Sequence, residues 1–154
     1  MKRAGLLIIA VAVALLLVVS SIAVARTFTC DQNRCRGTND RDTISGNRKG
    51  NTILALEGAD LVRGNGGRDS LHGDGGKDRL SGGNGDDVVN GDDRDDVVIG
   101  NGGNDRLNAG HGDDRVEAAD ENFDAISCGS GRHDIVIFDR RLDSVTRCEI
   151  KRRR

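Results

Sequence analysis

The chain has few of the residues from which an ordinary globular core is built. Its 154 residues include no tryptophan, tyrosine or proline and only three phenylalanines. Aromatic side chains supply much of the buried area of most cores, so their scarcity excludes a packed core of the usual kind. The net charge of −2 and the missing aromatics also argue against nucleic-acid binding, which relies on basic surfaces and on stacking.

Signatures of the common catalytic sites are also missing. None of the three histidines, His72, His111 and His133, lies in an H-E-x-x-H pattern. Ser130 is not part of a G-x-S-x-G elbow, and no Gly-Lys-Ser/Thr follows the glycine-rich segments. We therefore expect that the protein is not an enzyme.

Glycine and aspartate are abundant instead, and they recur with a period of nine residues. From Gly37 to Glu117 the period holds without insertion or deletion, and its clearest copy is GGNGDDVVN, residues 82–90. Two looser copies begin at Ala119 and Gly129, each after one extra residue. Residues 37–137 are therefore predicted to form one repetitive structure.

Two positions of the repeat are almost constant. The sixth position is an aspartate in all units but one: Asp42, Asn51, Asp60, Asp69, Asp78, Asp87, Asp96, Asp105, Asp114, Asp124 and Asp134. The eighth position is aliphatic in every unit: Ile44, Ile53, Val62, Leu71, Leu80, Val89, Val98, Leu107, Val116, Ile126 and Val136. Side chains alternate across a strand, so the eighth position is expected to point inward and its two neighbours outward.

A nine-residue unit is too short for a pair of helices. We interpret each unit as a six-residue glycine-rich turn followed by a three-residue strand. Equivalent strands stacked about 4.8 Å apart in a parallel solenoid satisfy the backbone, and the smallest closed coil contains two units, one strand on each wall. Glycines at positions one, three and four are expected to supply positive φ angles; examples are Gly64, Gly66, Gly67, Gly73, Gly75 and Gly76.

The copy GGNGDDVVN resembles the Gly-Gly-x-Gly-x-Asp-x-aliphatic-x nonapeptide of the bacterial repeats-in-toxin (RTX), or hemolysin-type, calcium-binding proteins. The resemblance covers Gly37 to about Ile137. It implies an all-β fold, a right-handed parallel β-roll with two repeats per coil. It also implies that Ca²⁺ lies between the turns of alternate units, bound by sixth-position aspartates and backbone carbonyls.

Carried over to this chain, the resemblance predicts two stacked sets of metal ligands. One set is Asp69, Asp87 and Asp105, and the other is Asp78, Asp96 and Asp114. Asp60 is a weaker candidate, because Leu56 and Glu57 occupy its turn. The unit at Gly46 has basic residues in its turn and Asn51 at the sixth position, so it is not expected to hold metal.

Calcium chemistry also fits these residues without the resemblance. Ca²⁺ takes six to eight oxygen ligands in a flexible cage, and carboxylates with exposed carbonyls supply them. Aspartates stacked about 4.8 Å apart repel each other by roughly 1 kcal/mol in water, so a cation between them is favoured. Because one aliphatic per unit makes a small core, we expect the chain to fold on Ca²⁺. The alternative is that aspartate and glycine serve only as turn formers.

The amino terminus predicts export. Two basic residues precede an apolar run from about Leu6 to Val19, and residues 23–25 read AVA, a small-x-small cleavage site. We interpret residues 1–25 as a secretory signal peptide that is cleaved before Arg26. The alternative is an uncleaved membrane anchor, since the uncharged stretch 4–25 is long enough to span a bilayer.

Four cysteines remain after cleavage: Cys30, Cys35, Cys128 and Cys148. An even number in an exported chain favours disulfides, whereas a zinc site would want C-x-x-C spacing, which neither pair has. The first two flank the start of the repeats and the last two flank their end. We therefore expect the disulfides Cys30–Cys35 and Cys128–Cys148.

A solenoid needs end caps that cover its last core layer and its open strand edges. We assign residues 26–36 to an N-terminal cap and residues 138–154 to a C-terminal cap with a solvated basic tail. Ile135, Ile137 and Phe138 are expected to cover the C-terminal end.

The predicted function is that of a secreted or cell-surface calcium-binding β-roll that serves as a structural, adhesive or matrix module. The alternative is an accessory or remnant module of a secreted RTX-type hydrolase or toxin system. Calcium ions are the expected partners, and a membrane is one only if the signal segment is uncleaved. The sequence does not identify a protein or surface-polysaccharide partner.

Overall fold

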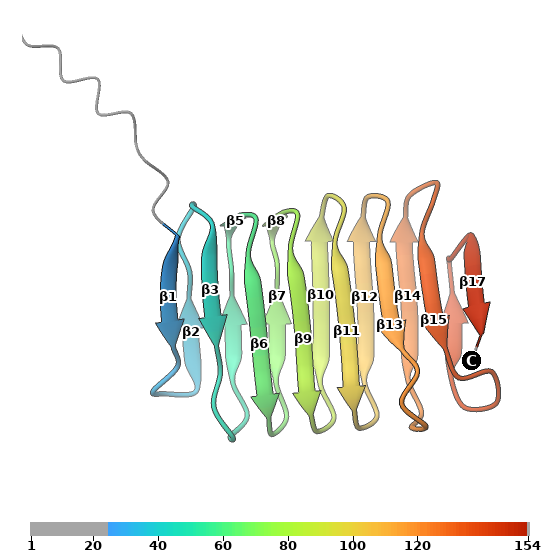
Figure 1. Ribbon diagram of the computed structural model, residues 1–154, viewed down its shortest axis with the longest axis horizontal. Helices are drawn as coiled ribbons and strands as arrows, with labels where there is room; N and C mark the ends of the chain where they lie inside the picture. Colours follow the sequence, from blue (N-terminus) through green and yellow to red (C-terminus); the bar gives the residue numbers. More distant parts are fainter. Residues whose placement is uncertain (1–24, 154) are drawn as a thin grey trace, which may run out of the picture.

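A computed structural model describes residues 25–153, so the predicted signal segment, residues 1–24, lies outside the described residues. The described chain is all-β, and it coils alternately through two parallel sheets that face each other (Figure 1). Residues 25–153 contain no helix with the length and hydropathy that a bilayer span needs.

The two sheets take alternate strands of the chain. The first sheet contains, in spatial order, β1 (Arg26–Thr29), β3 (Asp42–Ser45), β6 (Leu61–Gly66), β9 (Arg79–Asn84), β11 (Val97–Gly102), β13 (Arg115–Ala118), β15 (Ile135–Phe138) and β17 (Ile150–Arg153). The second sheet contains β2 (Arg34–Arg36), β4 (Thr52–Leu54), β7 (Ser70–His72), β10 (Val88–Asp93), β12 (Arg106–His111), β14 (Ala125–Ser130) and β16 (Ser144–Thr146). Two short strands, β5 (Glu57–Gly58) and β8 (Gly75–Gly76), extend the second sheet beside β10.

Every strand pair in these sheets is parallel, and equivalent residues of neighbouring coils stand side by side. In the first sheet Val62 pairs with Leu80, and Leu80 pairs with Val98. These partners are two nonapeptides apart in the sequence. The prediction of a parallel β-roll with two repeats per coil is therefore confirmed.

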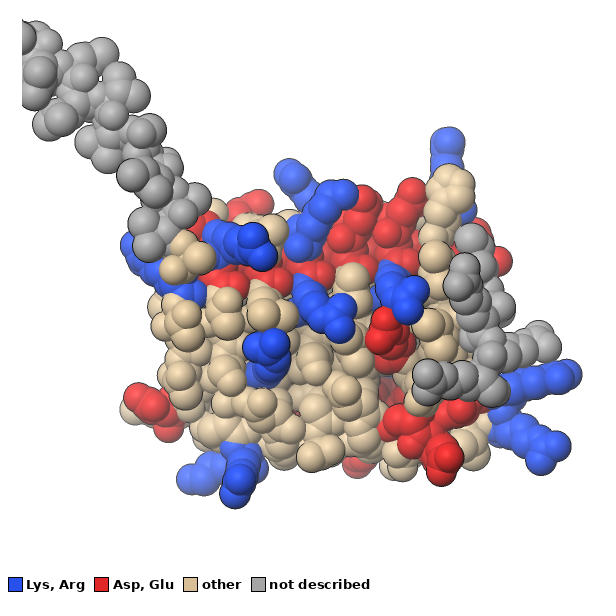
Figure 2. Space-filling model, viewed as in Figure 1, with Lys and Arg blue, Asp and Glu red and all other residues tan. Residues whose placement is uncertain are grey.

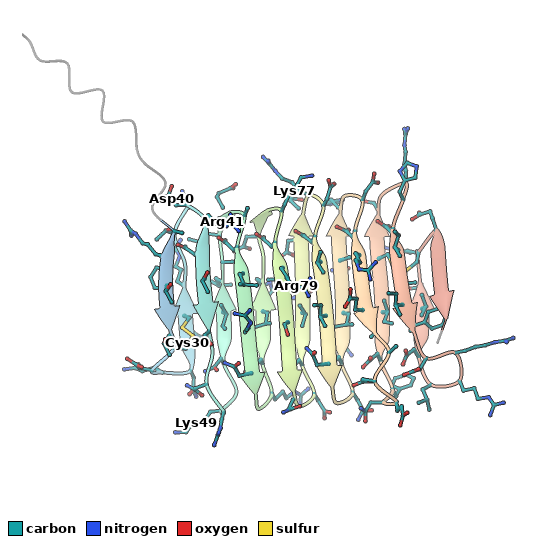
Figure 3. All side chains as sticks on the ribbon, viewed as in Figure 1. Cys30, Asp40, Arg41, Lys49, Lys77 and Arg79 are labelled. Atoms are coloured by element: carbon teal, nitrogen blue, oxygen red, sulfur yellow. A yellow bond between two sulfur atoms is a disulfide. The ribbon has the colours of Figure 1, made fainter. Side chains whose placement is uncertain are left out.

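Side chains alternate between core and surface along each strand. In β9, Leu80 and Gly82 are buried, whereas Arg79 and Ser81 point outward (Figure 3). The aspartate that precedes the strand, Asp78, is buried as well. All eleven eighth-position aliphatics belong to the core with 0–2% of their surface exposed, so the inward direction of that position is confirmed.

The expectation of three-residue strands is wrong for most of the central coils. Strands β6, β9, β10, β11, β12 and β14 each contain six residues. They continue through the first three positions of the next unit, where Asn65 pairs with Gly83 and Gly66 pairs with Asn84. Neighbouring coils stack in exact register, so the backbone N–H and C=O groups at the start of each turn can also bond to the same residues of the next coil. The hydrogen-bond ladder therefore continues from the strand into the turn.

The expected φ angles are right at position four and wrong at positions one and three. Gly67 and Gly76 have φ angles of +101° and +153°, but Gly64 and Gly66 lie outside the left-handed region, as do Gly73 and Gly75. Position two takes the other positive φ, for example +78° at Asn65 and +62° at Asp74. Asparagine and aspartate tolerate that conformation better than other non-glycine residues.

The terminal segments also form coils. Strands β1 and β2 pair with β3 and β4, and β16 and β17 pair with β14 and β15. Residues 150–153 therefore belong to a strand, and the solvation of the basic tail stays a prediction. Ile135 and Ile137 flank the buried Val136 on the outer side of β15 and do not cover the end; Phe138 is buried.

Both expected disulfides are present. Cys30 is bonded to Cys35, with 5.6 Å between their Cα atoms, and Cys128 is bonded to Cys148, with 5.1 Å. Each bond lies within one end of the roll, as the sequence predicted.

Candidate metal centre

The sixth-position side chains form two columns, one along each edge of the roll. We call them the upper and lower columns after their places in Figure 1. The upper column precedes the strands of the first sheet and contains Asp42, Asp60, Asp78, Asp96, Asp114 and Asp134. The lower column precedes the strands of the second sheet and contains Asn51, Asp69, Asp87, Asp105, Asp124 and Asp143. All of these except Asp143 are buried.

From Asp60 onward, one carboxylate oxygen of each stacked aspartate joins it to the preceding coil. Oδ1 of Asp87 accepts a hydrogen bond of 2.8 Å from the backbone N–H of Asp69, and Oδ1 of Asp105 accepts one of 2.8 Å from Asp87. In the upper column Oδ1 of Asp96 accepts a bond of 2.8 Å from Asp78. These bonds fix the aspartates in register, one per coil.

The other carboxylate oxygen has no partner. Oδ2 is buried and unbonded in nine aspartates: Asp60, Asp69, Asp78, Asp87, Asp96, Asp105, Asp114, Asp124 and Asp134. A buried polar atom without a hydrogen bond is costly, and a charged one more so. A repeated orphan oxygen of this kind is the feature that a bound cation would satisfy.

The first residue of the unit leaves room at this oxygen. A Cβ atom added to Gly73 would lie 2.7 Å from Oδ2 of Asp78 and 2.5 Å from the carbonyl oxygen of Gly91 in the next coil. A Cβ on Gly82 would lie 2.5 Å from Oδ2 of Asp87. Glycine at this position therefore keeps the carboxylate and a neighbouring carbonyl oxygen close together.

Burial and mutual repulsion weaken the acidity of both columns. The pKa of Asp96 is raised to about 8, chiefly by burial and also by the negative charges of Asp78 and Asp114, against the lowering effect of the N–H of Asp78. Burial likewise raises the pKa of Asp78 and of Asp87 to about 7. Each column therefore lacks a positive charge that would stabilise its ionised aspartates.

The donor set fits a hard cation with oxygen ligands. Between residues 25 and 153, no group of three or more histidine, cysteine, aspartate or glutamate side chains converges on a metal position. An ion in a column would contact carboxylates of consecutive coils, and backbone carbonyls would have to complete its shell. Calcium accepts such mixed, irregular oxygen sets, whereas zinc prefers a compact tetrahedron of nitrogen and sulfur ligands.

Comparison with protein families identifies the repeat. The profile described as RTX calcium-binding nonapeptide repeat (4 copies) matches residues 36–71, 54–89 and 90–122, which together are more than half of the chain. The chain belongs to the RTX calcium-binding repeat family. Searches of curated proteins and of solved structures gave no significant match.

Departures from the RTX consensus do not break the coil. Arg94 stands at position four of its turn, where glycine is usual, and it adopts a φ of +82°. Leu56, at position two in the turn of Asp60, adopts a φ of +79°. Both turns keep their aspartate buried, so Asp60 and Asp96 stay in the upper column.

The RTX columns are longer than the set of ligands that the sequence predicted. Asp124 and Asp134 also carry an unpartnered Oδ2, although the turn of Asp124 has no glycine. Asp143 continues the lower column, and its Oδ1 accepts a bond of 2.9 Å from the N–H of Asp124. The signal for Asp143 was available, because Asp143 and Val145 stand nine residues after Asp134 and Val136 and so continue the repeat by one more unit.

Exposed acidic side chains follow the same edges. Figure 2 shows them above and below the face of the first sheet, whose middle is mostly uncharged apart from some basic and acidic side chains. On the upper edge Asp95 pairs with Lys77, and Asp113 lies 3.2 Å from His133. The edges therefore present negative charge to solvent as well as to the interior.

Proposed function

We propose that this protein is a secreted calcium-binding β-roll that acts as an extracellular structural, adhesive or matrix module and folds as Ca²⁺ fills its turns. The observation that carries the proposal is the unpartnered Oδ2 atom repeated along both columns. Without a cation, each of these buried oxygens is unsatisfied and adds to the repulsion along its column. A calcium ion between consecutive aspartates would neutralise both.

We propose seven aspartates as metal ligands. They are Asp69, Asp87 and Asp105 in the lower column, and Asp60, Asp78, Asp96 and Asp114 in the upper column. Oδ2 is the ligand atom of each, because Oδ1 is already bonded to the preceding coil. Backbone carbonyls of the glycine-rich turns would supply the remaining ligands.

Export is part of the proposal. Disulfides persist mainly in oxidising compartments, and the chain carries two of them behind a segment with the features of a signal peptide. Mass spectrometry of the secreted protein should give Arg26 as its first residue. Protein with Met1 intact in the membrane fraction would support the anchor instead.

The proposed role is binding rather than catalysis. Each of the three histidines has a local polar neighbour on the surface: His72 lies 3.5 Å from Asp92, His111 contacts Ser130, and His133 contacts Asp113. His72 also lies 3.5 Å from the hydroxyl of Ser70, but both of its contacts are longer than the hydrogen bonds of about 2.6–3.2 Å that join the members of a catalytic triad. The proposal therefore assigns no catalytic residue.

A calcium titration followed by circular dichroism tests the proposal. Mature, oxidised protein in chelator should have a weak β-sheet signal, and millimolar Ca²⁺ should produce it cooperatively, because each ion orders two adjacent coils. Equal concentrations of Mg²⁺ serve as the matched control. A strong β-sheet signal that chelator does not change would contradict calcium-coupled folding.

A further inference from the structure

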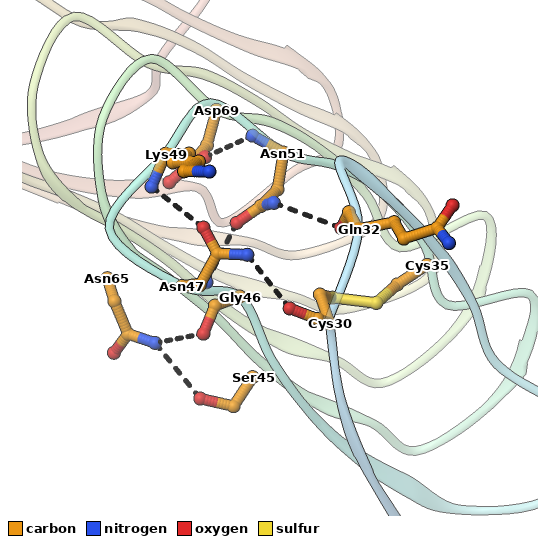
Figure 4. Close-up of a disulfide and its surroundings, with 10 residues drawn as sticks. All are labelled: Cys30, Gln32, Cys35, Ser45, Gly46, Asn47, Lys49, Asn51, Asn65 and Asp69. Carbon is orange, nitrogen blue, oxygen red and sulfur yellow. Dashed lines mark hydrogen bonds between the residues drawn. A yellow bond between two sulfur atoms is a disulfide. The ribbon is translucent and has the colours of Figure 1, made fainter.

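The turn of Asn51 differs from the turns that follow it in the lower column. Its side chain is an amide, and both ends of the amide are bonded (Figure 4). Oδ1 of Asn51 accepts a hydrogen bond of 2.8 Å from the N–H of Asn47, and Nδ2 donates one of 3.4 Å to the carbonyl oxygen of Gln32. In the next turn, Oδ2 of Asp69 has no partner.

A second asparagine, Asn47, adds further hydrogen bonds within this turn and to the preceding coil. Oδ1 of Asn47 accepts a bond of 2.8 Å from the N–H of Lys49, and its Nδ2 donates one of 2.8 Å to the carbonyl oxygen of Cys30. The two amides thus bind the turn to the preceding coil through protein atoms alone. The disulfide Cys30–Cys35 ties that preceding coil together (Figure 4).

The charges in the turn of Asn51 also disfavour a bound cation. Arg48 and Lys49 are both exposed beside Asn51, where the interior turns carry glycine or acidic residues in most units. Their charges repel a cation, and the amide of Asn51 brings no negative charge to hold one. The turn is therefore stable without a divalent ion and is poorly suited to bind one.

The first turn of the upper column is also partly closed by its own residues. Oδ2 of Asp42 accepts bonds from the N–H of Thr38 at 2.6 Å and from its hydroxyl at 2.9 Å, while Oδ1 of Asp42 is buried and has no partner. In the turns from Asp60 to Asp134 this oxygen is unpartnered. The first turn of the lower column is thus closed by side-chain bonds, and the first turn of the upper column is closed at one of the two oxygens of Asp42.

We propose that residues 26–54 form a calcium-independent end of the roll, in which the amide of Asn51 takes the place of a calcium ion, and that this end templates the calcium-dependent coils. The inference rests on the proposed calcium-coupled folding of the interior. A solenoid coil gains most of its order from a neighbour that is already folded. Strands β3 and β4 offer such a neighbour to β6 and β7 before any ion binds.

Hydrogen exchange followed by mass spectrometry tests the inference on the oxidised mature protein. In calcium-free buffer, peptides from residues 26–54 should stay protected, whereas peptides from residues 60–117 should exchange rapidly. Millimolar Ca²⁺ should protect both. Asn51→Asp removes the donor to Gln32, so exchange of residues 26–54 in calcium-free buffer should accelerate up to roughly tenfold, the effect of about one partly buried hydrogen bond.

Asn108→Asp is the matched control, because it makes the same chemical change on the outward side of β12. It should leave the protection of residues 26–54 unchanged. Rapid exchange of residues 26–54 without calcium in the unaltered protein would overturn the inference, as would an Asn51→Asp variant with unchanged protection. Slow exchange of residues 60–117 without calcium would instead refute the proposed function, so the two failures are distinguishable.

Discussion

Replacement of Asp87 by asparagine should weaken the folded protein only when calcium is present. Asp87 stands between Asp69 and Asp105 in the lower column, and its Oδ2 is buried and unpartnered. Asparagine has nearly the same shape and keeps an oxygen that can accept the N–H of Asp69. The substitution therefore removes the charge that would bind calcium and leaves the ladder intact.

The size of the effect follows from the number of ions that Asp87 can contact. Extracellular calcium modules bind with dissociation constants of about 10⁻⁴ to 10⁻³ M, so each ion at about 10 mM Ca²⁺ stabilises the folded state by about 1.4 to 2.7 kcal/mol. Asp87 has an aspartate neighbour on each side, so it can serve two ions. We expect the free energy of unfolding to fall by about 3 to 5 kcal/mol if both are lost.

Urea denaturation of the variant, followed by circular dichroism with and without calcium, measures this difference. In calcium-free buffer, where the unaltered protein should have only a weak β-sheet signal, Asp87→Asn should give a signal that is no weaker, because it removes a repelling charge. Asp86→Asn is the control: it makes the same change at the exposed neighbouring residue. Equal destabilisation in both buffers, or an equal effect of Asp86→Asn, would refute the assignment of Asp87 as a ligand.

Three further predictions follow from the columns and the core. Without calcium, the folded state should be most stable near pH 4 and lose stability as pH rises to about 8: burial raises the pKa of Asp78 and Asp87 to about 7 and of Asp96 to about 8, so the unfolded chain releases these protons first. The β-sheet signal in dialysed, calcium-free buffer checks this by circular dichroism, and a signal that strengthens as pH rises from 4 to 8 would contradict it. Leu80→Ala should cost about 2 to 5 kcal/mol because Leu80 is fully buried, whereas Arg79→Ala, on the outer side of the same strand, should cost little; equal urea midpoints for the two variants would count against the core assignment. Magnesium at 10 times the calcium midpoint should produce little β-sheet signal, because it demands a tight octahedron and loses water reluctantly; a full signal in magnesium would show that the columns do not select calcium.

The sequence was enough to predict the repeat, the coil and the column of aspartates. Strand side chains alternate with a period of two, so an aspartate at position six and an aliphatic at position eight must share the inner side. Leu80 and Asp78 show this directly, since both are buried on one side of Arg79. The pairing of the cysteines followed from their places at the two ends.

Other features depend on neighbouring coils and could not be predicted from one unit. The start of each turn joins the ladder only because an equivalent backbone lies beside it, so the strands are longer than the aliphatic pattern indicates. The positive φ of Asn65 and of Arg94 is set by turn geometry, whereas the sequence suggested glycine positions alone. Asp143 was missed although it stands nine residues after Asp134, because the turn before it, residues 138–142, contains no glycine.

A crystal structure of the mature protein grown in millimolar calcium, with anomalous scattering recorded to locate the ions, tests the central claim most directly. The account predicts calcium ions along both columns between residues 60 and 114, with Oδ2 of Asp69, Asp87 and Asp105 among the ligands in the lower column, and no ion at Asn51. Aspartates that keep an unliganded Oδ2 in calcium, with no anomalous peaks along the columns, would contradict it.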